Sequence, residues 1–78
     1  MVIVKDNGRV AVLYNAIAAR KGERTIDYLA CWLASYGIAR ENVEGAVLAA
    51  LPTGDFDGDD VWRSIVSIER ILGIRFDS

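Results

Sequence analysis

Residues 2–15 read VIVKDNGRVAVLYN, and the fold depends on whether this stretch forms two strands or one strand followed by a helix. Asn7 and Gly8 supply the two positive-φ positions of a type I′ turn, which is the strongest short-range signal for a β-hairpin. We therefore predict an N-terminal hairpin that turns at these two residues. A short helical turn is expected to begin after Asn15 and to end near Gly22.

A helix over residues 9–21 is the alternative, because apolar residues in this segment also recur at spacings of three and four. One face of that helix would consist of Val10, Leu13, Tyr14, Ile17 and Ala18. The opposite face would be almost as apolar and would expose Val12, so the hairpin is preferred. If the helix formed, the chain would be an all-α four-helix domain.

Three further segments have the period of amphipathic helices, at about 25–36, 40–51 and 58–72. Thr25 is a candidate N-cap of the first, and Gly37 stands where helices commonly turn left-handed. Pro52 ends the second helix. The inner stripe of the third is expected to contain Val61, Ile65, Ile68 and Leu72, widened by Trp62 and Val66. With residues 74–76 as a short C-terminal strand, the predicted fold is one helix-dominated α+β domain spanning residues 1–78.

The composition argues against catalysis. The chain contains no histidine, which is the commonest general base and zinc ligand in proteins. Its single cysteine, Cys31, lies inside a predicted helix and has no histidine to activate it. A domain of this size also has little room for a pocket of ~300 Å³ or more. We therefore expect no enzymatic activity and no cofactor.

The charge and the apolar content point to the setting and the kind of partner. A net charge of −2 lacks the basic surplus that nucleic-acid-binding proteins usually carry. No apolar run is long enough to span a membrane, and no secretory signal is visible. A free thiol without such a signal predicts a cytoplasmic protein. Because 53% of the residues are hydrophobic, self-association is one way to cover surplus apolar surface.

Aromatic residues recur every four positions in the first of the three helices, at Tyr28, Trp32 and Tyr36. Such a stripe most often belongs to a core. Tyrosine and tryptophan are also enriched at the energetic centres of protein interfaces. We interpret this aromatic stripe as core or, alternatively, as a protein-binding surface.

An acidic loop, GDFDGDDVW, precedes the third helix and contains four carboxylates, at Asp55, Asp57, Asp59 and Asp60. Alternating aspartates are typical of a calcium loop, but two positions do not fit. The sixth should be glycine and is Asp60, and the twelfth should be a bidentate acid and is Val66. The loop is therefore interpreted as turn chemistry with helix-terminal charge, and as a second candidate protein-binding surface, without a metal.

Helices at 25–36 and 40–51 with a short turn between them also have the outline of a helix-turn-helix DNA reader. The candidate DNA-binding residues of this alternative are Arg20, Lys21, Arg24, Arg40 and Asn42. Glu41 and Glu44 on the presumed recognition helix would repel phosphate, so DNA binding is the second choice.

By elimination, the sequence predicts a protein–protein interaction module. It would act as a regulator, adaptor or inhibitor by occupying a surface on a larger partner.

Overall fold

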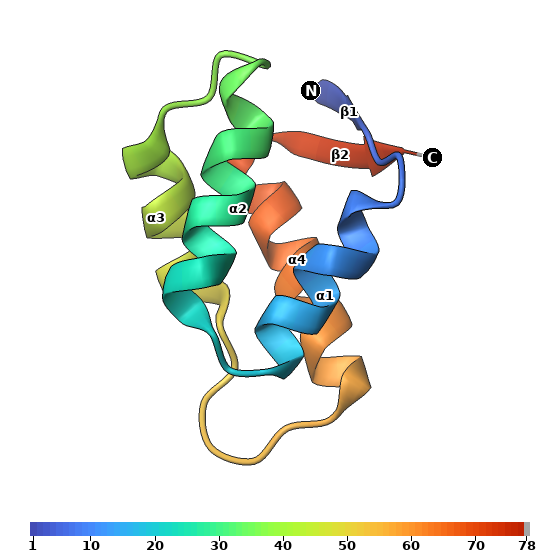
Figure 1. Cartoon of the computed structure of the whole chain (residues 1–78), viewed down its shortest axis with the longest axis vertical. Coiled ribbons are helices and arrows are strands. Elements are labelled where there is room, and N and C mark those ends of the chain that lie inside the picture. Colours follow the sequence, from blue (N-terminus) through green and yellow to red (C-terminus); the bar gives the residue numbers. More distant parts are fainter. Residues whose placement is uncertain (78) are drawn as a thin grey trace.

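Four helices and two short strands make up the computed structural model, which describes residues 1–77 (Figure 1). Their order is β1 (Val2–Lys5), α1 (Arg9–Ala18), α2 (Gly22–Ala34), α3 (Arg40–Ala50), α4 (Gly58–Leu72) and β2 (Ile74–Asp77). The helix-dominated α+β prediction is confirmed in this coarse form. The number of helices is four rather than the three expected.

The predicted turn at Asn7 and Gly8 forms, but a helix comes after it. Both residues have positive φ, 50° and 82°, and the Arg9 N–H donates to the Asp6 carbonyl at 2.9 Å across the turn. The Asp6 side chain then accepts a hydrogen bond from the Val10 N–H at 2.8 Å and so satisfies one of the amides at the start of α1.

The N-terminal hairpin prediction is therefore wrong. The α1 face that carries Val10, Leu13 and Ile17 is buried against the other helices. In a strand these three side chains would not all point to the same face, because side chains alternate between the two faces. Val12 remains 47% exposed, as the helical alternative requires. Tertiary burial of one apolar face decides the structure here, although the local turn signal suggested a hairpin.

The strand β1 pairs with β2 in parallel instead, so the first and last elements of the described chain lie side by side. Val2 is opposite Ile74 and Lys5 is opposite Asp77. The predicted C-terminal strand at 74–76 is confirmed and extends to Asp77. Gly73, with a φ of 67°, ends α4 in the left-handed conformation and lets the chain turn into β2.

The helices α3 and α4 match their predicted ranges closely, whereas α2 begins and ends earlier than the predicted range of about 25–36. Thr25 is therefore not an N-cap. The helix α2 begins at Gly22, and the buried Thr25 hydroxyl donates to the Lys21 carbonyl one turn earlier, at 2.9 Å. The buried stripe of α4 is narrower than expected, because Trp62 and Val66, which were predicted to widen it, are 49% and 42% exposed.

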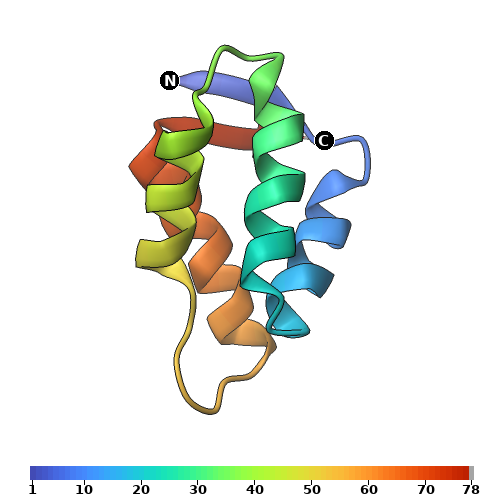
Figure 2. The ribbon, with the colours of Figure 1, turned by 60° about the vertical axis from the view of Figure 1, so that its left-hand side comes forward.

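The core lies between the four helices, and the two strands lie across one end of them (Figure 2). Side chains that are almost fully buried in it include Val4, Leu13, Leu29, Leu33, Val43, Val47, Val61, Ile68 and Ile74. No helix in the described part of the chain is both long and apolar enough to cross a membrane.

Candidate protein-interaction surface

The centre of the aromatic stripe belongs to the core. Trp32 is 4% exposed, and its ring is stacked on Phe76 of β2 with the centroids 4.8 Å apart. Tyr28 lies beside it at a centroid distance of 6.4 Å and is only partly buried. The Trp32–Phe76 contact attaches the small sheet to α2, so the structure gives Trp32 a packing role.

Tyr36, at the far end of the stripe, also supports the sheet. Its hydroxyl oxygen accepts a hydrogen bond from the Lys5 N–H at 3.1 Å. The N–H groups of Val2 and Asp6 donate to the carbonyls of Gly73 and Asp77. Because N–H groups alternate between the two edges of a strand, the N–H of Lys5 points to the opposite edge of β1, which has no neighbouring strand among the described residues. Tyr36 therefore satisfies a donor on an open sheet edge. Protein binding by the aromatic stripe stays a prediction.

A groove between α1 and α2 was not anticipated from the sequence, because the chain from Arg9 to Asn15 was expected to be a strand with only a short helical turn after it. It encloses a hollow of about 320 Å³, although a domain of this size was expected to have little room for one. Its lining comes from Val12, Asn15, Ala16, Ala19, Lys21, Arg24 and Tyr28. The helical alternative required Val12 to be exposed, and this exposed valine was the signal in the sequence that could have revealed the groove.

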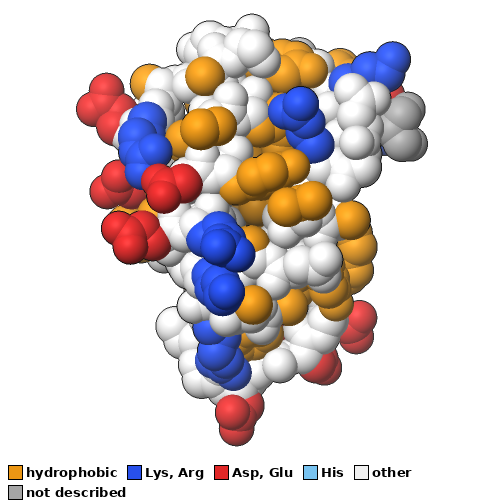
Figure 3. All heavy atoms as spheres, in the orientation of Figure 1, with side chains coloured by type: hydrophobic (Ala, Val, Ile, Leu, Met, Phe, Trp, Pro, Cys, Tyr) orange, Lys and Arg blue, Asp and Glu red, His pale blue; other side chains and the backbone are white. Residues whose placement is uncertain are grey.

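Basic side chains border the groove at both ends. Lys21 and Arg24 line one end, and within residues 1–77 neither takes part in an ion pair. At the other end Arg9, one turn before Val12 on α1, extends over the Trp32 ring at 5.9 Å. Figure 3 shows basic side chains beside the apolar surface on this face, with acidic side chains toward its margins. The groove is thus apolar along its floor and positive at its ends.

The residues of the DNA-binding alternative take part in different contacts. The Arg20 guanidinium donates to the Gly54 carbonyl at 2.8 Å and lies over the Phe56 ring at 4.3 Å, so it braces the loop between α3 and α4. Lys21 and Arg24 lie on the groove already described.

Arg40 pairs with Asp27 across α2 and α3. That hydrogen bond, together with the negative charge of Asp27, raises the pKa of the Arg40 guanidinium. Asn42 is exposed on α3, on the same helix as the exposed Glu41 and Glu44. The charges on α3 therefore give no support to a recognition helix, and DNA binding stays a prediction.

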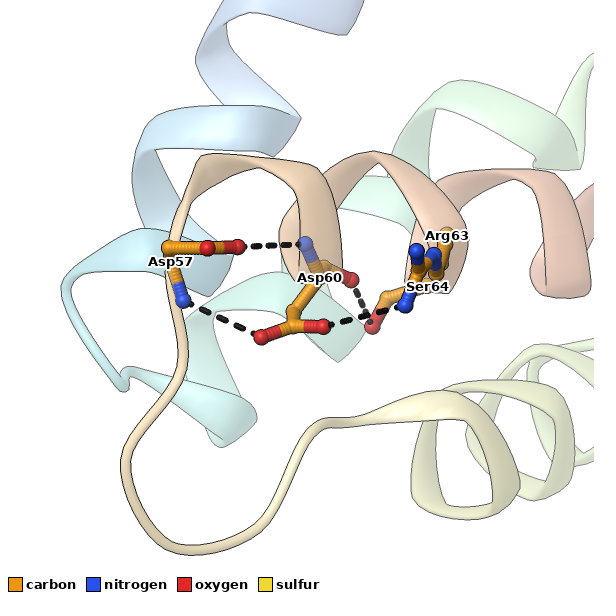
Figure 4. A network of polar contacts seen from close by, with 4 residues as sticks. All are labelled: Asp57, Asp60, Arg63 and Ser64. Atoms are coloured by element: carbon orange, nitrogen blue, oxygen red, sulfur yellow. Dashed lines mark hydrogen bonds and ion pairs between the residues drawn. The ribbon is translucent and has the colours of Figure 1, made fainter.

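Two of the four aspartates in the acidic loop cap α4 (Figure 4). The Asp60 N–H donates to the Asp57 carboxylate, and the Asp57 N–H donates to the Asp60 carboxylate, both at 3.1 Å. Asp60 also faces Arg63 at 3.6 Å. This is a reciprocal capping box, and it explains the spacing of the two residues without a ligand.

Asp55 and Asp59 are exposed beside the capping box. Within residues 1–77, no group of three or more histidine, cysteine, aspartate or glutamate side chains is arranged to hold a metal ion. Binding of a protein partner by the acidic loop stays a prediction.

The accessible tryptophan is Trp62 rather than Trp32. Trp62 is half exposed on α4, and its ring packs against Tyr14 of α1 at a centroid distance of 5.1 Å. The two rings line a second hollow on the other side of α1, together with Ala11 and Asn15. The outer face of α1 is therefore flanked by a groove on each side.

No known protein family, no curated protein and no solved structure matches this chain. The function is therefore argued from the surface of the molecule.

Proposed function

We propose that the chain is a small protein-interaction module that acts as a regulator, adaptor or inhibitor, and that a partner docks in the groove between α1 and α2. The exposed Val12 above an apolar groove is the observation that supports this proposal. The side chain of Val12 is 47% exposed, and covering it with a partner would remove apolar surface from water, which favours binding.

The shape and the charge of the groove support the same reading. Two adjacent helices with an apolar channel between them are a common receptor for an amphipathic segment of another protein. Lys21 and Arg24 would fix the orientation of such a segment, because complementary charges contribute more to specificity than to affinity. The hollow between α3 and α4, in contrast, is lined by Glu41 and Asn42 as well as by apolar residues.

Affinity capture from a lysate of the source cell, with two matched variants, tests the proposal. Val12→Glu places a charge in the groove, and Val66→Glu makes the same change on α4 at nearly the same exposure, 42%. Both substitutions are at exposed helical positions, so we expect both variants to keep the far-ultraviolet circular dichroism of the unchanged chain. A partner that is captured by the unchanged chain and by Val66→Glu, but lost with Val12→Glu, would support the proposal. If every captured protein is retained by Val12→Glu, the groove is not the docking surface.

A further inference from the structure

We propose that the groove between α1 and α2 accepts the outer face of α3 from a second copy of this chain, in a head-to-tail contact. This inference goes beyond the proposed function, because it names an occupant of the groove when no other partner is bound. It also gives a specific form to the self-association that the apolar composition predicts.

The outer face of α3 has the pattern of a helix that docks in a groove. Its exposed residues include Glu41, Glu44, Gly45, Leu48 and Ala49, which recur at spacings of three and four. Leu48 is 63% exposed, one of the most exposed large apolar side chains in the described chain. A Cβ atom added at Gly45 would meet no atom of the described residues within 4 Å, so the glycine leaves this face flat enough for close approach. Helices that bind in grooves use anchors at this spacing.

The charges of the two surfaces are complementary. The groove carries Lys21 and Arg24 at one end, with no ion pair to neutralise them within the described residues. The outer face of α3 carries Glu41 and Glu44 toward its amino end and Leu48 one turn beyond. A copy of α3 whose glutamates lie beside the two cations would therefore place its apolar half over the apolar floor of the groove.

The lengths of the two surfaces also agree. Glu41 and Leu48 are seven positions apart, which is about 10.5 Å along a helix at a rise of 1.5 Å per residue. Val12 on α1 and Ala19, the residue directly after α1, line the groove and are separated by the same number of positions. When Glu41 lies near the Ala19 end, Leu48 reaches Val12.

The groove and the outer face of α3 are two different surfaces of the molecule, and in the proposed head-to-tail contact each pair of neighbouring copies uses one of each. One copy offers its groove, and the next copy offers α3. Repeated head-to-tail contacts build either an open chain, which leaves an unused groove at one end and an unused α3 at the other, or a ring, in which every groove is filled. A protein partner bound in the groove would compete with this assembly.

Charge reversal on each surface tests the proposal in light scattering and analytical ultracentrifugation at low salt. The groove variant combines Lys21→Glu with Arg24→Glu, and both positions lie at the start of α2, where negative charge favours the helix. The α3 variant combines Glu41→Lys with Glu44→Lys. A third variant, Leu48→Ala, removes the anchor at an exposed position and does not add charge near the helix terminus.

We expect the unchanged chain to gain mass with concentration, and each of the three variants alone to remain at the monomer mass while keeping its circular dichroism. In each charge-reversed variant, the groove and α3 carry charges of the same sign and repel each other. Mixing the groove variant with the α3 variant should restore association, because the groove of each then meets an α3 of opposite charge. One chain that carries all four reversals should associate for the same reason.

Each other outcome would overturn the proposal. A monomer mass for the unchanged chain at every concentration removes the contact. Association that survives either reversal alone, or a mixture of the two charge-reversed variants that stays monomeric, assigns self-association to another surface. These results are independent of the capture experiment, because the α3 variant leaves the groove intact for other partners.

Discussion

Replacing Trp32 by alanine distinguishes the two interpretations of the aromatic stripe. Trp32 is 4% exposed and is stacked on Phe76, so the substitution removes a buried ring and leaves a cavity beside the sheet. Truncating a buried aromatic residue to alanine typically costs about 3–5 kcal/mol of unfolding free energy. A domain of this size has a total of roughly 4–12 kcal/mol at 0.05–0.15 kcal/mol per residue. The variant should therefore be strongly destabilised and, at the lower end of that range, unfolded.

Urea titration followed by far-ultraviolet circular dichroism measures the effect. With a slope of about 1 kcal/mol per molar urea, the unfolding midpoint should fall by about 3 M or more. Trp62→Ala is the matched control, because that ring is half exposed and keeps a contact with Tyr14. We expect it to cost about 1–2 kcal/mol from partial burial and the aromatic pair. If Trp32→Ala costs no more than Trp62→Ala, the packing role of Trp32 is wrong and the stripe is available for binding.

Three further measurements test other parts of the structure. Asp57→Ala removes the N-cap of α4 and should lower the unfolding free energy by about 1 kcal/mol, which corresponds to a fall in Tm of about 4–8 °C. The control Asp55→Ala should leave Tm unchanged, and equal shifts would contradict the capping role. Tyr36→Phe should speed amide hydrogen exchange at Lys5, because its N–H loses the hydroxyl acceptor, and an unchanged exchange rate would show that this bond does not protect the edge. Mixed DNA duplexes at low salt should not retain the chain, and salt-sensitive retention would revive the DNA-binding alternative.

The sequence predicts the helices from residue 40 onward well because their signals are local. The range of α4 is the predicted one, and α3 ends one residue earlier than expected. The aspartates at the start of α4 and Gly73 after its end act through neighbouring backbone groups, so they can be recognised without the rest of the fold.

The N-terminal segment could not be predicted in the same way. Asn7 and Gly8 correctly indicate positive φ at both positions, but a turn alone does not determine whether a strand or a helix comes next. The choice depends on burial of the α1 face and on pairing of β1 with residues 74–77, which lie at the far end of the sequence. Interactions at that separation leave no local pattern for a single sequence to reveal.

The candidate site was missed for the same reason. A groove requires two helices side by side, and only one of the two was predicted. Aromatic type is also a weak guide to exposure, since Trp32 is buried and Trp62 is half exposed although each lies in an amphipathic helix. The tertiary position of a helix decides which of its flanking residues face solvent.

The parallel pairing of β1 with β2 has a mechanical consequence. Val2 begins one strand and Asp77 ends the other, so the two positions lie at opposite ends of the ribbon they share (Figures 1 and 2). Tension applied between them would slide the strands past each other and load their hydrogen bonds simultaneously, whereas a hairpin in the same place would have opened one bond at a time. We therefore expect the small sheet to resist a force that pulls Val2 and Asp77 apart along the strands.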